Sequence, residues 1–352
     1  MRILRPTLLI GTSLIVALAA GEILVRALDV IDRVNGFPRK LFQASDDPDL
    51  KYTMRPNVAL RVRSIDVKTN SLGMRAREVP FEPPADTWRI LVVGDSVAFG
   101  EGLPVEQAFP ALLEARLRAD TQRPVEVLSG GVEGYNTLSE LAFFRDVGVK
   151  LHPGTLVIAF SLNDWDRAPA IDPRGFLTRD PNPQRKLSLI ERSELLPVVL
   201  VAITEAYKRL RRRRDTTPAD PRGFSPFDLY VSSVRKAFWA SPRGEGLAEL
   251  EAGLSGFAEE ARQRRLQVVV AILPDGDQLH TDKPDLNPQV NARALCERFH
   301  LPSIDLYPAF RESPEWPLFF DIMHPNAAGH AIIARQLAGY LEAPDRGRPI
   351  AP

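Results

Sequence analysis

From Trp88 onward the sequence alternates short, continuous apolar runs with longer amphipathic stretches, and this alternation restricts the possible folds more than any other feature. The apolar runs lie at 90–94, 125–130, 155–161, 267–273 and, in shorter form, 303–307, and the helical stretches lie near 106–119, 137–147, 244–265, 288–299 and 326–342. Strands that are apolar at every position are buried on both faces, which is typical of parallel strands covered by helices on each side. The pattern therefore predicts an α/β fold with a parallel sheet of about five strands.

The segments outside this regular pattern divide the chain further. Residues 36–87 are rich in Pro, Asp and Arg and contain short alternating pieces, which predicts a stalk that passes into a small strand-rich elaboration. The sheet domain is expected over 88–345, with an insertion at about 165–241 that interrupts the alternation. This insertion holds the apolar piece ELLPVVLVAI and the basic cluster Lys208–Arg214. The favoured interpretation is a surface helix with a solvated basic end, and the alternative is a helix that lies on a membrane surface.

Residues 1–35 carry the features of an export signal. The stretch Pro6–Gly21 has no charge, and apolar residues continue at helical spacing toward Leu28. Two basic residues, Arg2 and Arg5, precede this stretch. A cleaved signal peptide and an uncleaved signal anchor both fit, and the length of the apolar run favours the anchor. We therefore expect an N-terminal transmembrane helix that passes the membrane once. The rest of the chain should then lie outside the cytoplasm, because the basic flank stays inside.

Composition excludes several classes of function. The 45 basic and 45 acidic residues cancel, so no excess charge predicts a nucleic-acid partner. The single cysteine, Cys296, excludes an internal disulfide framework and a multi-cysteine metal site. A phosphate-binding Gly-x-x-x-x-Gly-Lys pattern does not occur, which disfavours a nucleotide-dependent enzyme. The apolar fraction of 44% in 352 residues is enough for a large core, but nothing in the sequence determines the oligomeric state.

Four polar clusters follow the predicted strands or stand near the end of the domain. They are GDS at 94–96, GGVEGYNT at 130–137, SLND at 161–164 and DIMHPNAAGH at 321–330. Each cluster alone is typical of a helix cap or a turn. Because the carboxyl ends of parallel strands meet at one edge of a sheet, we expect the clusters to lie together there. Together they supply a hydroxyl nucleophile, a base, an acid to orient the base and donors for an oxyanion, which are the parts of an acyl-transfer site.

Ser96, His324 and Asp321 are the residues on which this chemistry depends. Serine is a weak nucleophile near neutral pH until a base within hydrogen-bond reach takes its proton, and His324 is expected to be that base. Asp321 comes three residues before His324, close enough for its carboxylate to bond the other ring nitrogen and fix the tautomer. Asp95 and Asp164 have a simpler interpretation as residues that cap helices or steady their loops.

In these four clusters the sequence resembles the SGNH, or GDSL, hydrolase superfamily. The resemblance covers roughly residues 88–343 and is most specific in VVGDSVAFGEG and DIMHPNAAGHAIIARQLAGYL. It implies a flavodoxin-like three-layer α/β/α sandwich, a triad of Ser96, Asp321 and His324, and oxyanion donors at Ser96, Gly134 and Asn163. The expectation includes no cofactor and no metal ion. The stretch VKTNSLGMRAREV also resembles exported, membrane-anchored members of the superfamily.

The sequence departs from the pattern of this superfamily at two places. Ser161 stands two residues before Asn163, where Gly is usual, and Ser129 begins the second block, where Asn is usual. Neither departure removes a catalytic group, although both affect the expected shape of the oxyanion loop. The nucleophile elbow of an α/β-hydrolase is disfavoured, because Ala98 stands at the position of its last glycine.

A metal site is the alternative interpretation of Asp321, His324 and His330. Pro325 is expected to begin a helix, and two positions six residues apart then face different sides of that helix. We therefore expect His330 to be a packed or surface residue of the helix and not a ligand.

The sequence thus predicts an exported, membrane-anchored serine esterase that cleaves carboxylic esters, in particular acetyl or other acyl esters, through an acyl-serine intermediate. An O-acyltransferase that passes the acyl group to an extracytoplasmic polysaccharide would use the same residues and stays open. An alternative from another class is a non-catalytic carbohydrate-binding or scaffold protein with a vestigial triad. The ester substrate, for example an acylated polysaccharide or a lipid, is not specified by any residue.

Overall fold

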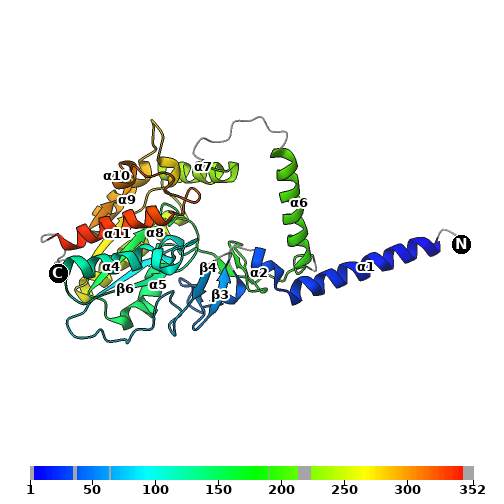
Figure 1. Ribbon diagram of the computed structural model, residues 1–352, viewed down its shortest axis with the longest axis horizontal. Helices are drawn as coiled ribbons and strands as arrows, with labels where there is room; N and C mark the ends of the chain where they lie inside the picture. The colour runs from blue at the N-terminus through cyan, green and yellow to red at the C-terminus, as the bar shows by residue number, and fades with distance from the viewer. Residues whose placement is uncertain (1–3, 35–37, 63–64, 189, 213–222, 344–352) are drawn as a thin grey trace.

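The computed structural model of the protein describes residues 4–34, 38–62, 65–188, 190–212 and 223–343. A parallel sheet of five strands forms its centre, in the spatial order β11-β10-β7-β5-β6 (Figure 1). These strands are β5 (Trp88–Gly94), β6 (Val125–Gly131), β7 (Thr155–Phe160), β10 (Gln267–Ile272) and β11 (Ser303–Asp305). The predicted α/β fold with a five-stranded parallel sheet is confirmed. Strand β5 lies between β6 and β7, so the loops that follow these three strands adjoin one another.

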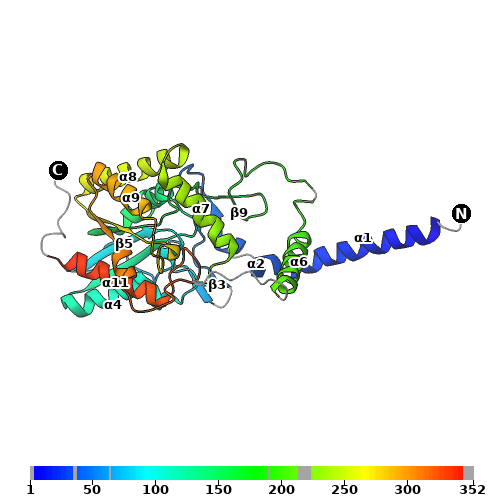
Figure 2. The ribbon, with the colours of Figure 1, turned by 90° about the horizontal axis from the view of Figure 1, so that it is seen from above.

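Helices cover both faces of the sheet (Figure 2). On one face lie α4 (Phe109–Thr121) and α11 (Ala327–Glu342), and on the other lie α5 (Thr137–Asp146), α8 (Glu245–Arg264) and α9 (Asn287–Arg298). Successive side chains of a strand point to opposite faces, so Ile90 packs in the core under α4 and α11, whereas Leu91 packs in the core under α5, α8 and α9. Each fully buried side chain of this size contributes about 1.5–3 kcal/mol.

Short helical turns complete the sheet domain. They are α3 (Ser96–Phe99), η2 (Val105–Gln107), η3 (Gly148–Leu151), η4 (Gly276–Gln278) and α10 (Tyr307–Arg311). The position of α3 depends on a glycine in the neighbouring strand. A Cβ atom at Gly131 would lie 2.2 Å from the amide nitrogen of Phe99, so only glycine allows α3 to pack against the end of β6.

Residues 38–79 form small antiparallel pairs that pack on the sheet domain. After η1 (Arg39–Leu41), strand β1 (Phe42–Ala44) pairs with β2 (Tyr52–Met54), and β3 (Ala59–Val62) pairs with β4 (Ile65–Lys68). Phe42, Tyr52 and Met74 are fully buried in the same core as Leu91. The strand-rich elaboration is therefore present, but the interpretation of this segment as a stalk is wrong, because its apolar side chains help to fill the core.

The insertion between β7 and β10 has two parts that behave differently. It contains β8 (Ala170–Ile171), β9 (Leu177–Thr178), α6 (Leu195–Arg212) and α7 (Pro226–Ala240). Helix α7 packs on the domain: Trp239 is fully buried, and its Nε1 donates a hydrogen bond of 2.9 Å to the carbonyl of Leu162. Helix α6 instead stands beside the N-terminal helix, away from the sheet (Figure 1).

The N-terminal helices α1 (Leu4–Ala27) and α2 (Val30–Val34) precede the domain, and α1 projects away from it (Figures 1 and 2). Among the residues that the structure describes, no helix has the length and apolar character needed to cross a membrane. The predicted transmembrane helix is thus not found in this part of the chain. Within α1, residues 11–21 carry no charged side chain. Glu22 follows them and forms an ion pair with Arg26.

Candidate active site

Ser96 is the first residue of α3 and follows the carboxyl end of β5 closely. The side chain of Asp95 accepts a hydrogen bond of 2.9 Å from the amide of Val97 and so caps this short helix, as predicted. A Cβ atom at Gly94 would lie 2.7 Å from Cβ of Ala98, so glycine lets the chain turn directly from the strand into α3. Ser96 is therefore held at the edge of the sheet, with 8% of its surface exposed.

Asp321 and His324 lie in a tight loop that precedes α11. One carboxylate oxygen of Asp321, Oδ1, accepts hydrogen bonds from the amides of Met323 at 2.7 Å and His324 at 2.8 Å. The amide of Phe320 donates to the carbonyl of His324 at 2.8 Å, which closes the loop. The three-residue spacing thus folds the aspartate back onto its own histidine.

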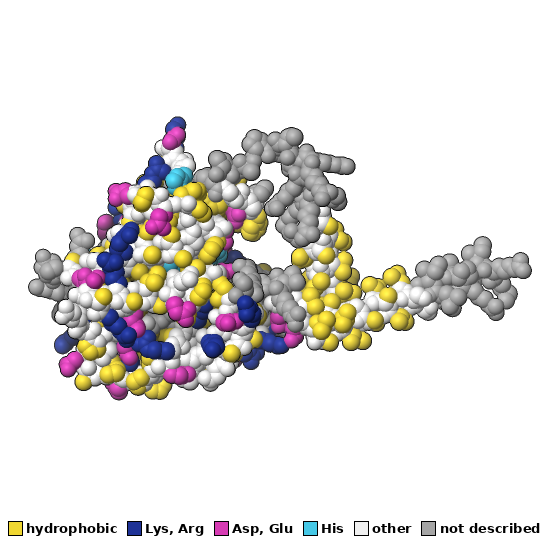
Figure 3. Space-filling model, in the orientation of Figure 1, with side chains coloured by type: hydrophobic (Ala, Val, Ile, Leu, Met, Phe, Trp, Pro, Cys, Tyr) yellow, Lys and Arg dark blue, Asp and Glu magenta, His cyan; other side chains and the backbone are white. Residues whose placement is uncertain are grey.

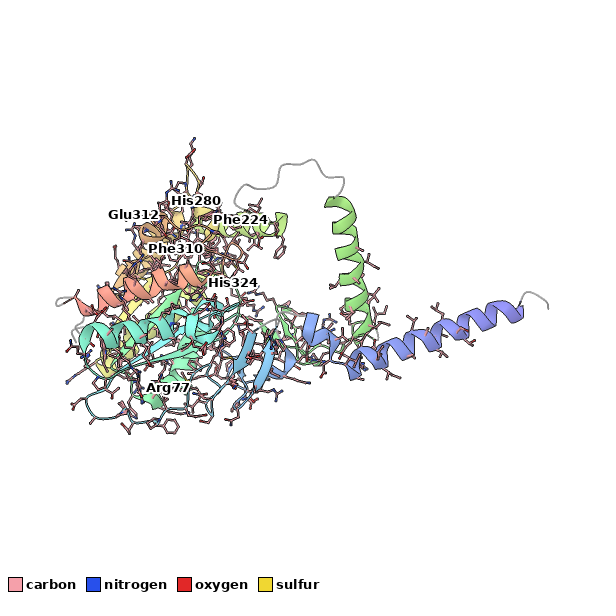
Figure 4. The ribbon with its side chains drawn as sticks, in the orientation of Figure 1. Arg77, Phe224, His280, Phe310, Glu312 and His324 are labelled. Atoms are coloured by element: carbon pink, nitrogen blue, oxygen red, sulfur yellow. The ribbon has the colours of Figure 1, made fainter. Side chains whose placement is uncertain are left out.

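The structure brings Ser96, His324 and Asp321 together although 228 residues separate the first two. Oγ of Ser96 lies 2.9 Å from Nε2 of His324, and Nδ1 of His324 lies 2.7 Å from Oδ2 of Asp321. His324 is at the edge of the domain that is nearer to α6 (Figure 4). A nucleophile, a base and an orienting carboxylate in hydrogen-bond contact are the arrangement that acyl transfer through serine requires.

The charges around His324 favour its protonated form. Burial disfavours the charged ring, but hydrogen bonds to Asp321 and Glu101, together with the charges of both carboxylates, outweigh burial and raise the pKa of His324 from 6.5 to about 10. Burial also acts against ionisation of Asp321, but the hydrogen bonds and charge of His324 and the amide of Met323 lower its pKa to about 2. The pair is therefore an ion pair at neutral pH, and His324 must lose a proton before it can accept one from Ser96.

Glu101 is a member of the site that the sequence analysis missed. Its Oε2 lies 3.0 Å from Nε2 of His324, the same nitrogen that Ser96 contacts, and its side chain is only 13% exposed. The sequence held one signal, an acidic residue between Gly100 and Gly102 shortly after the nucleophile. Nothing in that pattern indicated that the carboxylate would turn toward the histidine.

Arg75 holds the loop that carries Glu101. Its guanidinium is buried and donates hydrogen bonds to the carbonyls of Phe99 and Gly100, both at 2.9 Å, and of Leu103 at 2.7 Å. Arg75 belongs to the segment 36–87, which was predicted to be a stalk that passes into a small strand-rich elaboration. The segment before the sheet domain therefore helps to position a group that contacts His324.

The two predicted oxyanion donors outside α3 lie in the loops that flank it. Gly134 follows β6, with φ of +80°, and its amide has no hydrogen-bond partner among the described residues. The carbonyl of Glu133 accepts a hydrogen bond of 2.6 Å from the hydroxyl of Tyr52, which fixes this loop. Asn163 follows β7, and its Nδ2 lies 3.4 Å from Oδ2 of Asp95, next to Ser96. Both residues thus have a spare N–H at the edge of the sheet where Ser96 lies.

The two serines that depart from the family pattern have local partners. The hydroxyl of Ser129 donates to the carbonyl of Ala98 at 2.9 Å, and the hydroxyl of Ser161 donates to Oδ1 of Asp95 at 3.0 Å. Both hydroxyls therefore support α3 and its cap. Their effect is to stabilise the helix that begins with Ser96, without a hydrogen bond to Ser96, His324 or Asp321.

Buried carboxyl groups lie behind the site. Burial raises the pKa of Asp95. Burial, and in second place repulsion from neighbouring carboxyls, raises the pKa values of Asp164 and Glu140 well above their ordinary ranges. Asp164 also accepts hydrogen bonds from the hydroxyl of Thr137 and the amide of Ser161. These contacts support the structural interpretation of Asp164.

His330 does not belong to the site. It is buried in α11, stacks on the ring of Phe109, and its Nδ1 accepts a hydrogen bond of 3.0 Å from the amide of Phe109. The expectation that Pro325 begins this helix is wrong, because Pro325 pairs with Phe319 in an isolated bridge and Asn326 caps the helix. Within the described ranges no three His, Cys, Asp or Glu side chains are grouped so that they could hold a metal ion.

Comparison with known proteins gives one family and several similar structures. The GDSL-like lipase/acylhydrolase family matches residues 92–332, which include Ser96, Asp321 and His324. Among curated proteins, no match to the sequence was found.

Three solved structures illustrate the likeness. The chain is 17% identical to TesA, with a TM-score of 0.41 over 72% of this chain and 98% of TesA. It is 17% identical to LAE5, an alpha/beta hydrolase enzyme from the metagenome of Lake Arreo, Spain, with a TM-score of 0.43 over 72% of this chain and 96% of LAE5. It is 16% identical to Axe2, an acetylxylan esterase from Geobacillus stearothermophilus, with a TM-score of 0.43 over 72% of this chain and 94% of Axe2.

Proposed function

Since the chain belongs to the GDSL-like lipase/acylhydrolase family, we propose that it hydrolyses carboxylic esters through an acyl-serine intermediate on Ser96. The observation that carries the proposal is the continuous contact from Oγ of Ser96 through the ring of His324 to Asp321, at 2.9 and 2.7 Å. Each of the three groups has the partner that its chemical role needs.

Acylation begins when neutral His324 takes the proton of the Ser96 hydroxyl at Nε2 and Oγ attacks the carbonyl carbon of the ester. The negative charge that develops on the carbonyl oxygen is stabilised by N–H donors of Ser96, Gly134 and Asn163. The protonated ring, held by Asp321, then gives its proton to the leaving alcohol as the carbon–oxygen bond breaks. The acyl group remains on Oγ.

Deacylation repeats the same proton transfers with water as the nucleophile. Nε2 of His324 takes a proton from water, the hydroxide attacks the acyl carbon, and the proton returns to Oγ of Ser96 as the free acid leaves. The orientation of His324 must persist through both half-reactions, and the hydrogen bonds from the amides of Met323 and His324 to Asp321 provide that rigidity.

The proposal includes a catalytic domain outside the cytoplasm, which rests on the sequence alone. Pro6–Gly21 carries no charge and follows Arg5, as in an export signal. A fusion of residues 1–36 to alkaline phosphatase, an enzyme that is active only after export, tests this part. An inactive fusion that is made in full would refute export by this segment.

The catalytic part is tested with p-nitrophenyl esters from acetyl to long-chain acyl, with and without sugar acceptors. We expect free carboxylic acid as product, no turnover by Ser96→Ala, and labelling of the wild type by a fluorophosphonate at Ser96. Ser233→Ala is the matched control, because Ser233 is an exposed helical serine and its loss should change nothing.

Each other result has a definite meaning. Labelling that survives Ser96→Ala would show that another serine is the nucleophile. Transfer of the acyl group to the sugar, with little free acid, would make O-acyl transfer the better description. Neither turnover nor labelling in the folded wild type would refute catalysis and favour a binding or scaffold role.

A further inference from the structure

Helices α1 and α6 carry apolar side chains that the rest of the described chain does not cover. On α6, Leu196, Val199, Leu200 and Ile203 are 39–59% exposed and recur at the spacing of one helix face. On α1, Leu14, Ile15 and Leu18 are more than half exposed. Figure 3 shows these side chains as a continuous hydrophobic area over α6 and the adjoining part of α1.

Polar contacts join the two helices at their base. The carboxylate of Glu22, on α1, accepts hydrogen bonds from the amides of Glu194 and Leu195 at 2.9 and 3.0 Å, so it caps the start of α6. Arg26 donates to the carbonyl of Arg192 at 2.5 Å and lies 3.5 Å from Glu194. The corner between α1 and α6 is therefore built by specific bonds, and α6 runs across the direction of α1 (Figures 1 and 2).

Two cavities meet at this corner. The first, of about 540 Å³, is lined by apolar side chains of both helices, among them Leu18, Leu196 and Val199. The second, of about 500 Å³, is lined mainly by cationic side chains, which are Arg26, Arg39, Arg174, Arg185, Lys186 and Arg192. Arg26 and Arg192 line both cavities, so an apolar space and a basic space adjoin.

Not all of the cations in the basic cavity are neutralised. Arg39 pairs with Glu194 at 2.6 Å, Arg174 pairs with Asp172 at 2.7 Å, and Arg185 pairs with Asp180 at 2.9 Å. For Lys186 and Arg192, by contrast, the described part of the chain offers no carboxylate within ion-pair distance. The same sign of charge continues along the sequence of α6, which ends in KRLRR.

We propose that the α1–α6 corner is a docking site for an anionic phospholipid surface, with a lipid phosphate in the basic cavity and acyl chains against the apolar cavity. A surface with negative headgroups above hydrocarbon matches a basic cavity next to an apolar one. Leu200 and Ile203 then lie at the headgroup–acyl boundary. Docking at this depth does not require either helix to cross the bilayer.

The direction of the corner relative to the catalytic domain supports this occupant. The apolar cavity is lined by residues of α1, of α6 and of the segment 190–193 that precedes α6. Helix α1 projects away from the sheet domain, and the sheet domain lies on the other side of α6 (Figure 1). A membrane at the corner would leave the sheet domain in water. The membrane would also face the edge of the sheet domain that carries His324 (Figure 4).

The experiment uses the full chain with an environment-sensitive dye on an introduced cysteine. Val199→Cys places the dye in the corner, and Val290→Cys, at a 53% exposed valine of α9, is the matched control. Both carry Cys296→Ala, which removes the buried native thiol. Vesicles of phosphatidylcholine, with or without phosphatidylglycerol and with brominated acyl chains, are added. We expect a blue shift and bromine quenching at position 199 in anionic vesicles, and neither at position 290.

A second variant tests the basic cavity. Lys186→Ala with Arg192→Ala should weaken binding to anionic vesicles by about fivefold for each cation, or roughly 25-fold together, and should leave the melting temperature unchanged. Equal signals at positions 199 and 290 would overturn the proposal. A dye signal at 199 that depends on protein concentration without lipid would also overturn it, because a second copy of the chain would then cover the corner. Equal binding to neutral and anionic vesicles would refute the preference for an anionic surface, because phosphatidylcholine also carries a phosphate but has no net charge. None of these readouts depends on ester turnover.

Discussion

Replacing Glu101 by Gln removes a negative charge beside His324, the proposed base, while it keeps the size of the side chain. Oε2 of Glu101 lies 3.0 Å from Nε2 of His324, and this contact helps to raise the pKa of His324 to about 10. In Glu101→Gln only Asp321 remains as a carboxylate partner. The pKa of His324 should therefore fall, and the neutral ring that accepts the Ser96 proton should form at lower pH.

The size of the effect follows from the single bond that is lost. A hydrogen bond to a charged group contributes about 1.5–3 kcal/mol, and one pKa unit corresponds to about 1.36 kcal/mol. The pKa of His324 should thus fall by about one to two units. At a pH below the pKa of His324 in both the wild type and the variant, the fraction of neutral His324 rises about tenfold for each unit by which the pKa falls. At a fixed acidic pH, kcat/KM should therefore rise about 10- to 100-fold.

The assay is kcat/KM for p-nitrophenyl acetate between pH 5 and pH 10, together with the NMR titration of His324. Glu106→Gln is the matched control, since Glu106 is an exposed carboxylate in the same region with no contact to His324 among the described residues. If the acidic side of the pH profile of kcat/KM has the same position in Glu101→Gln as in the wild type, the reasoning is refuted. A loss of the plateau rate would show instead that Glu101 takes part directly in catalysis.

Stability gives an independent check with the opposite sign. A histidine whose pKa in the folded state is raised above 6.5 stabilises the fold fully below that value, and the contribution disappears as pH rises toward 10. Glu101→Gln should therefore lower the melting temperature at pH 6 and have a smaller effect near pH 10. The variant would be more active and less stable at the same acidic pH.

Asp321→Asn should keep the fold but lower kcat by about 10⁴, because the amide selects the wrong tautomer of His324, and retained turnover would contradict the triad. Asn163→Ala should lower kcat by about 10²–10³ with little change in KM, whereas a role in a turn alone would lower the melting temperature and spare kcat. Arg75→Met should lower the free energy of unfolding in urea by about 3 kcal/mol, because three carbonyls lose a charged donor, and an unchanged value would show that water replaces it. The wild type should lose stability as pH rises above 4.5, since burial raises the pKa of Glu140 well above that value, and Glu140→Gln should reduce this loss in melts between pH 4 and pH 8.

The sequence by itself predicted the sheet and the grouping of Ser96, Asp321 and His324, because a local pattern could be combined with a topological rule. Runs such as 90–94 and 155–161 are apolar at every position, which identifies buried parallel strands without knowledge of their partners. The carboxyl ends of such strands share one edge, so Ser96 and Asn163 could be placed there from their positions alone. The three-residue spacing of Asp321 and His324 is itself a short-range geometric constraint.

Only the tertiary structure decided which distant side chains meet. Glu101 contacts His324 because Arg75 binds the loop carbonyls, and nothing in the local sequence around either residue encodes that bond. The segment 36–87 was expected to begin as a stalk before its strand-rich part, because short alternating strands do not reveal what their apolar faces cover. Glu22 likewise reads as an interruption of an apolar stretch, whereas in the fold it caps α6. Periodicity reports whether a side chain is buried, but its partner depends on the packing of the whole chain.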